Sequence, residues 1–257
     1  MGMPISLALR GRHADDDAGE AAWQHALALI READRMFSTY RADSFISLLD
    51  RGETSLAECP MEVREVLALG EQARTDSGGA FDVRRADASG VAHLDPSGVV
   101  KGWAVDRAAA PLRALLYTDF CLSAGGDMVC HITTGAGPWR IGIEHPHDAG
   151  RLVAVVPVAN GAVATSGLSH RGAHISDART GRVPTALASV TVIGPDLVWA
   201  DIDATAAFAL GAEAPRWLET RQGRIGIVVC ADGRRILTGT SESGRSRPEG
   251  PPMTVQA

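Results

Sequence analysis

Lys101 is the only lysine in the chain, and the residues around it suit the binding of an anion. It lies in the segment LDPSGVVKGWAVD, where Ser97, Gly98 and Gly102 are small and a helical pattern of apolar residues begins at once. A glycine-bearing turn lets the backbone approach a ligand closely, and the N-terminus of a helix favours negative charge. The alternative is an ordinary turn before a helix, with a solvated lysine. The segment alone leaves both interpretations open.

Asp201 and Thr205 form a second candidate pair, within the predicted helix WADIDATAAFALG. Residues four apart on a helix share a face, so their oxygens point the same way. One carboxylate and one hydroxyl are too few for a closed cage, but they suit Mg²⁺, which keeps waters and substrate phosphates in its shell. Asp203 is also present, and Asp/Thr pairs are common on helices, so the pair alone does not establish a metal site.

Three other segments have residues that could do chemistry. His174 in HISDARTGRVP is a candidate acid, base or phosphate ligand, or else an incidental residue of a surface turn. The Tyr40 ring could stack on a planar ligand or belong to the core. The pair Gly125–Gly126 follows a predicted strand and could cradle a phosphate or form only a tight turn.

The elements that must position these residues can be predicted from periodicity and capping. We expect a strand over 3–10, helices over about 18–36 and 60–75, a helix after Lys101 that breaks at Pro111, several strands between 120 and 194, helices over 199–211 and 214–222, and a hairpin over 224–239. The segments 37–49 and 84–93 show no clear period. Helices, then strands, then helix and hairpin indicate an α+β fold rather than regular βαβ alternation. We expect one domain over 1–239 and a disordered tail over 240–257, which is rich in Ser, Gly and Pro.

Composition restricts the class of protein. At 257 residues the chain can form one large domain or two small ones. A net charge of −6 argues against a nucleic-acid surface. The four cysteines are scattered without a C-x-x-C pair, which favours free buried thiols in a reducing compartment. The apolar stretch at the start is too short to span a membrane. We therefore expect a cytoplasmic protein with no membrane insertion.

Taken together and in order, the segments closely resemble the ApbE family, the FAD:protein FMN transferases. The matching segments are MGMPISL, MFSTYRADSFIS, GGAFDV, LDPSGVVKGWAVDRAA, SAGGD, WRIGIEHP, VATSG, HISDARTGRVP, SVTVIGP and ADIDATAAFALG. The resemblance implies an α+β fold of the thioesterase-flavin-transferase kind, with a mixed or antiparallel sheet and flanking helices. It also implies that FAD is bound as substrate with Mg²⁺, that FMN is transferred to a Thr or Ser hydroxyl of an acceptor protein, and that AMP leaves.

The resemblance also assigns residues. It implies metal ligation by Asp201, Thr205 and the backbone carbonyl of Val100. His174 would act near the diphosphate, and Lys101 lies in the same loop as the Val100 carbonyl. From the chemistry, Lys101 or His174 could stabilise the charge that develops on cleavage, and Asp177 or the metal itself could help to deprotonate the acceptor hydroxyl. Flavin contacts would come from a larger set: Met1, Tyr40, Ala80, Phe81, Asp82, Ser97, Trp103 and Ile175.

One departure from the family pattern bears on function. Typical members carry a long insertion with a W-G-F element where this chain has only eleven residues between Asp82 and Leu94. A compact variant could transfer FMN, could hydrolyse FAD to FMN and AMP, or could only bind flavin. Intact metal positions argue against pure binding, whereas transfer and hydrolysis share every site residue.

Overall fold

The computed structural model describes residues 2–86, 90–168, 172 and 175–239. Its helices and strands follow in chain order: β1 (Ile5–Gly11), α1 (Asp17–Phe37), α2 (Phe45–Asp50), η1 (Leu56–Glu58), α3 (Met61–Asp76), β2 (Arg84–Ala86), β3 (Ala92–Leu94), α4 (Ser97–Ala108), α5 (Ala110–Arg113), β4 (Thr118–Ala124), β5 (Asp127–His131), β6 (Trp139–His145), β7 (Asp148–Val158), β8 (Gly161–Gly167), β9 (Leu187–Gly194), α6 (Leu197–Leu210), η2 (Gly211–Glu213), α7 (Ala214–Leu218), β10 (Ile225–Cys230) and β11 (Arg235–Thr238).

A seven-stranded antiparallel sheet in the order β1-β4-β5-β8-β9-β10-β11 is the centre of the fold. Its central strands β5, β8, β9 and β10 bury residues on both faces, so alternate residues enter different clusters. On β8, Ala162 and Ala164 pack toward the helices, whereas Val163 packs toward the hairpin of β6 and β7. Successive residues of such a strand therefore pack into two different hydrophobic cores, one on each face of the sheet.

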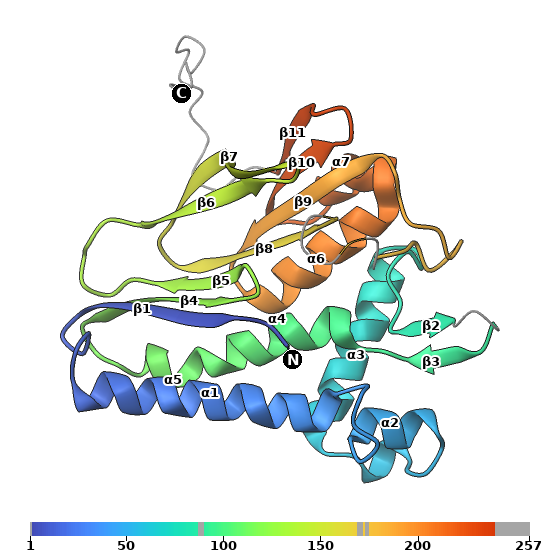
Figure 1. Ribbon diagram of the computed structural model, residues 1–257, viewed down its shortest axis with the longest axis horizontal. Helices are drawn as coiled ribbons and strands as arrows, with labels where there is room; N and C mark the ends of the chain where they lie inside the picture. The colour runs from blue at the N-terminus through green and yellow to red at the C-terminus, as the bar shows by residue number, and fades with distance from the viewer. Residues whose placement is uncertain (1, 87–89, 169–171, 173–174, 240–257) are drawn as a thin grey trace.

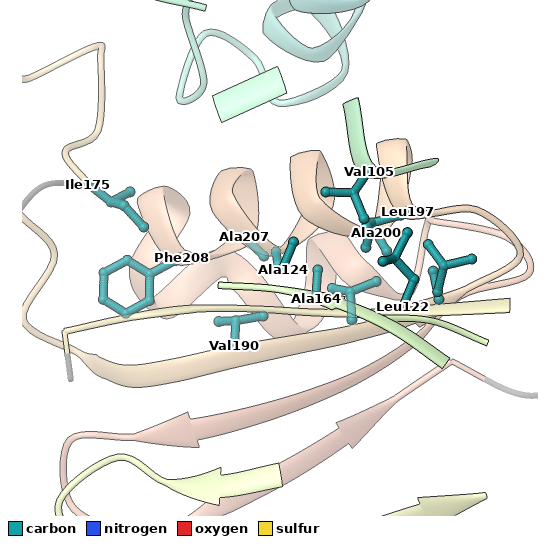
Figure 2. Packing of buried hydrophobic residues seen from close by; sticks show 14 of the residues in the cluster. Val105, Leu122, Ala124, Ala164, Ile175, Val190, Leu197, Ala200, Ala207 and Phe208 are labelled. Atoms are coloured by element: carbon teal, nitrogen blue, oxygen red, sulfur yellow. The ribbon is translucent and has the colours of Figure 1, made fainter. Parts of the chain in front are cut away.

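Helices cover one face of the sheet and the β6–β7 hairpin covers the other (Figure 1). Figure 2 shows the helical side, where Ala200, Ala207 and Phe208 of α6 meet Ala164 and Val190 of the strands. A second cluster lies between α6 and the helices α1, α3 and α4. Because α6 packs on both sides, it is apolar around nearly its whole circumference.

The predicted α+β class is confirmed, and most predicted elements are present. Asp16 caps α1 by accepting the N–H groups of Ala18 and Gly19. The helix expected after Lys101 begins earlier, at Ser97, so Lys101 lies within α4 rather than in a turn before it. This helix ends at Ala108, and α5 begins at Ala110, just before Pro111. Pro60 is the residue before α3 rather than its first helical residue.

Two segments without a clear period do contain structure. The strands Arg84–Ala86 (β2) and Ala92–Leu94 (β3) pair antiparallel, and α2 lies within the segment 37–49 and extends to Asp50. Both elements are too short for periodicity to detect. The predicted disordered tail over 240–257 lies outside the described residues.

Candidate active site

A cavity of about 450 Å³ lies where α4, α6 and the β2–β3 hairpin approach the strands β5, β6, β8 and β9. This size is within the range of ligand pockets in proteins. Its lining is apolar on the side of Met128, Ile141 and Val163, and polar on the side of Lys101, Asp201 and Thr205. The site residues predicted from the sequence that line it are Ala80, Phe81, Asp82, Ser97, Lys101, Ile175, Asp201 and Thr205.

Lys101 reaches this cavity because α4 and α6 pack unusually closely at Gly102. A Cβ atom on Gly102 would lie 2.7 Å from the Leu197 carbonyl oxygen and 2.9 Å from the Asp201 Cβ. The absence of a side chain lets the Gly102 N–H donate to Asp201 Oδ2 at 3.0 Å, across 99 positions of sequence. The glycine after Lys101 therefore fixes the second turn of α4 against the carboxylate of α6.

The Lys101 ammonium lies between two buried carboxylates. Its Nζ is 2.5 Å from Asp127 Oδ2 and 3.2 Å from Asp201 Oδ1. Asp127 begins β5, directly after the tight turn at Gly125–Gly126, and its other oxygen accepts the Thr165 N–H at 3.1 Å. The Ala124-Gly125-Gly126-Asp127 segment thus supplies a carboxylate partner for Lys101.

The three charges affect one another's protonation. Burial and the charge of Asp201 raise the pKa of Asp127 to about 7, although Lys101 opposes this. Burial favours the neutral amine of Lys101, but the charges of Asp201 and Asp127 outweigh it and raise the pKa of Lys101. The lysine is therefore a fixed positive charge at neutral pH.

Thr205 lies one turn after Asp201 on α6 and lines the same cavity. Its Oγ1 is 3.0 Å from the Ser166 Oγ of β8. The polar side therefore holds hard oxygen donors around a position that already attracts a cation, the Lys101 ammonium. This donor set fits Mg²⁺ with waters and substrate phosphates in its shell. Among the described residues there is no group of three or more His, Cys, Asp and Glu side chains that could hold a metal by themselves.

The segment Ala80–Asp82 forms another part of the cavity lining. The Phe81 N–H donates to the Ser77 hydroxyl at 3.0 Å, and the Ala80 carbonyl accepts the Ala178 N–H at 3.1 Å. The Phe81 ring lies so close to Gly98 that a Cβ there would be 3.0 Å away. These contacts join the two segments that the resemblance assigns to flavin binding, 80–82 and the start of α4.

Four predicted site residues are placed differently. Tyr40 is 98% exposed, and Trp103 is buried against Phe37, with their ring centroids 5.3 Å apart. Val100 is buried in the first turn of α4, beside Lys101. None of these three is among the described residues that line the cavity, nor is Asp177, although its neighbours Ser176 and Ala178 are. Their assigned roles stay predictions.

The Asp177 carboxylate is paired with the Arg179 guanidinium, whose Nε and Nη2 donate to it at 2.9 and 2.8 Å. This bond with Arg179 lowers the pKa of Asp177 and so weakens it as a base. The predicted contacts of Met1 and His174 fall outside the described residues.

Several cavity residues were not predicted from the sequence. Arg84 and Arg85 of β2 bring positive charge to the lining, and β6 contributes Ile141 through Glu144. Ser166 lies in the segment VATSG, which matches the family pattern, so this match could have identified Ser166 as a site residue. The two arginines could not be predicted as site residues, because nothing in the sequence shows that β2 lines the cavity.

Fold and site together define an α+β protein with a ligand cavity, in which a lysine is held by two buried carboxylates beside a hydroxyl pair. The ApbE family profile matches residues 1–89 and 84–229 of the chain. The chain belongs to the ApbE family.

Relatives with assigned names support this membership. The chain is 31% identical over 166 residues to a FAD:protein FMN transferase of Escherichia coli K12, covering 60% of this chain and 47% of that protein. It is 34% identical over 128 residues to one of Rhodobacter capsulatus, covering 47% of this chain and 24% of the other. The chain thus spans about half or less of the length of these two relatives.

Solved structures share the fold. The ApbE protein of Thermotoga maritima superposes with a TM-score of 0.77 at 19% identity, covering 92% of this chain and 94% of that one. The flavin transferase ApbE of Vibrio cholerae gives a TM-score of 0.75 at 22% identity, covering 93% and 94%. In the part of the chain that the structure describes, no helix is both long and apolar enough to cross a bilayer.

Proposed function

We propose that this chain cleaves the diphosphate of FAD, transfers FMN to a Thr or Ser hydroxyl of an acceptor protein, and releases AMP. The observation that carries the proposal is the Lys101 ammonium, held between Asp127 and Asp201 in a cavity that Thr205 also lines. Family membership and the name of the relatives, FAD:protein FMN transferase, support the same reaction.

Three basic side chains of the cavity lining suit a diphosphate, although the lining also holds Asp82, Asp95, Glu144 and Asp201. Lys101 is positioned to contact phosphate oxygens, and Arg84 and Arg85 add positive charge to the lining. Cleavage of the diphosphate builds negative charge on the leaving AMP, and a cation held in the site stabilises such charge. The apolar side near Met128 and Ile141 suits a ring of the dinucleotide.

Asp201 and Thr205, with the Val100 carbonyl, are the residues that we propose hold Mg²⁺. When bound, Mg²⁺ would neutralise phosphate charge and hold the reacting groups in line. The role of the chain is to present Asp201 at a fixed position, which the Gly102 N–H does through its bond to Oδ2.

The acceptor hydroxyl must lose a proton, and Asp177 or the metal itself is proposed to assist this step. The ion pair of Asp177 with Arg179 means that a role for Asp177 requires the arginine to turn away, for example toward a phosphate. The flavin contact proposed for Tyr40 likewise requires a ligand that extends beyond the cavity, and the contact proposed for Trp103 requires its buried ring to become accessible. A cytoplasmic location stays an expectation, based on the scattered cysteine thiols.

The test is incubation of the purified chain with FAD and Mg²⁺, with and without a candidate acceptor protein encoded beside it. We expect AMP release and a covalently fluorescent acceptor on a denaturing gel. Asp201→Ala should abolish both, whereas Asp232→Ala, in the β10–β11 turn far from the cavity lining, should not. AMP and free FMN without acceptor labelling would instead identify an FAD pyrophosphatase. No AMP under any condition would refute both.

A further inference from the structure

Lys101 occupies the place where a divalent cation would meet Asp201. The carboxylate of Asp201 is 2% exposed, and its Oδ2 accepts the Gly102 N–H, while Oδ1 is the oxygen that Lys101 contacts at 3.2 Å. Thr205, the other proposed side-chain ligand, follows one turn later on the same helix. A cation bound by Asp201 and Thr205 therefore meets the carboxylate oxygen that Lys101 contacts.

We propose that Lys101 is an internal counter-ion that competes with the divalent cation for Asp201, so that metal binding requires Lys101 to turn toward an anionic ligand. The proposal rests on the proposed function, because that function supplies both the metal and the diphosphate. Lys101 then acts as a positioning residue that couples the binding of metal to the binding of nucleotide.

Electrostatics gives the reason for the competition. Asp127 and Asp201 are both almost fully buried, and two buried carboxylates near each other are costly unless a positive charge lies between them. Lys101 supplies that charge in the metal-free protein. A divalent cation at Asp201 would lie within a few ångströms of the ammonium, and like charges at that separation repel strongly in a buried site.

The Lys101 side chain has room to move away from Asp201 toward the cavity. Its side chain is 20% exposed and lines the cavity, and a lysine stem is long and flexible. Asp127, which begins β5 rather than α6, can keep one contact while Lys101 leaves Asp201. A diphosphate in the cavity would compensate the displaced ammonium, so metal and diphosphate should each strengthen the binding of the other.

A single-lysine chain allows a direct measurement. Protein grown with ¹⁵N- and ¹³C-labelled lysine gives side-chain NMR signals from Lys101 alone. We expect these signals to move when Mg²⁺ is added, and to move at a Mg²⁺ concentration about tenfold lower when ADP is present as the diphosphate probe. Signals that do not change as Mg²⁺ saturates the protein would overturn the proposal. This experiment needs no substitution, so it decides the matter even if a variant fails to fold.

Two substitutions should act in opposite directions on the binding of Mn²⁺, measured by calorimetry without nucleotide. Lys101→Gln removes the competing charge and should tighten Mn²⁺ binding about tenfold, whereas Asp127→Asn leaves the ammonium on Asp201 alone and should weaken it about tenfold. A merely structural lysine would give weaker binding in both variants, which would refute the competition. Arg113→Gln, which removes a charge from an exposed pair with Asp106, is the matched control and should change nothing.

The outcomes separate this proposal from the proposed function. If Lys101→Gln tightens Mn²⁺ binding but the native chain releases no AMP from FAD, the competition stands and the transferase activity fails. If the native chain releases AMP while the Lys101 NMR signals do not change on addition of Mg²⁺, the proposed activity is supported and the proposed competition for Asp201 is refuted.

Discussion

Asp201 and Asp203 lie two residues apart on α6 and face opposite sides of the helix. Asp201 contacts Lys101 in the cavity, whereas Asp203 pairs with Arg221 at 3.1 Å and Arg224 at 2.6 Å. Arg221 also binds Asp76 at 2.8 Å, so this second cluster joins α6 to the end of α3 and to the segment before β10. One acidic residue of the segment ADID is therefore placed for chemistry and the other for stability.

This division predicts different effects of the two isosteric substitutions. Asp203→Asn removes the charge that two arginines share in a buried cluster, and breaking such a pair costs about 3 kcal/mol of unfolding free energy. Asp201→Asn leaves Lys101 paired with Asp127, so this variant should lose AMP release from FAD but less unfolding free energy than Asp203→Asn. Urea unfolding and AMP release, measured on both variants, check this. Equal loss of stability in the two variants would contradict the division.

Gly102→Ala should lower both stability and activity. Its Cβ would lie 2.7 Å from the Leu197 carbonyl oxygen, so α4 must move away from α6. Such overpacking costs about 1–3 kcal/mol and also shifts Lys101 relative to Asp201. Gly137→Ala is a suitable control, because a Cβ there meets no atom within 4 Å. Thermal unfolding of both variants tests the prediction, and equal melting temperatures would contradict it.

Asp119 should make the fold sensitive to acid. Burial would raise its pKa, but hydrogen bonds from Thr133 and Thr134 and the pair with Arg10 lower the pKa of Asp119 from 3.8 to about 2. A carboxyl whose pKa is lower in the folded state adds stability above its unfolded pKa, and this contribution is lost as pH falls from about 4 toward 2.

The check is urea unfolding of the native chain and Asp119→Asn between pH 7 and pH 2.5. The native chain should be the more stable at pH 7, and the difference should shrink as the pH falls below about 4. If the difference in unfolding free energy stays constant over this range, Asp119 stabilises the fold through packing and neutral hydrogen bonds rather than through its charge.

Arg84 and Arg85 should strengthen the binding of FAD. Both line the cavity, and arginine binds phosphate oxygens with charge-assisted hydrogen bonds. Replacing both by Ala should weaken FAD binding about tenfold, with a smaller effect at high salt. Fluorescence titration of FAD without added metal measures this. Arg234→Ala, in the exposed β10–β11 turn, is the control; if it weakened FAD binding as much as the double variant does, the effect would not be local to the cavity.

Tyr40→Ala should affect the binding of FAD without affecting the stability of the fold. Because Tyr40 is 98% exposed, its truncation should leave the melting temperature unchanged. If the ring covers flavin as the family resemblance implies, the dissociation constant of FAD should rise severalfold, since ring contacts are worth about 0.5–1.5 kcal/mol. An unchanged dissociation constant would remove Tyr40 from the site.

The sequence by itself determined the α+β class, most of the elements and part of the candidate site. Alternating residues predict strands such as β8 and β9, and Asp16 caps α1 as its position before a helical pattern implies. Ordered matching segments brought Asp201, Thr205 and Lys101 forward as site residues. These features are local, because a cap, a strand period or a helical i, i+4 pair depends only on neighbouring residues.

Tertiary structure alone decided which charges meet. Nothing local distinguishes Asp201 from Asp203, or shows that Asp127 from a strand would hold Lys101 from a helix. Nor does the period of residues 84–94 reveal a hairpin that brings Arg84 to the cavity. Such contacts join residues far apart in sequence, and they form only because the packing of α4, α6 and the sheet closes the chain into one geometry.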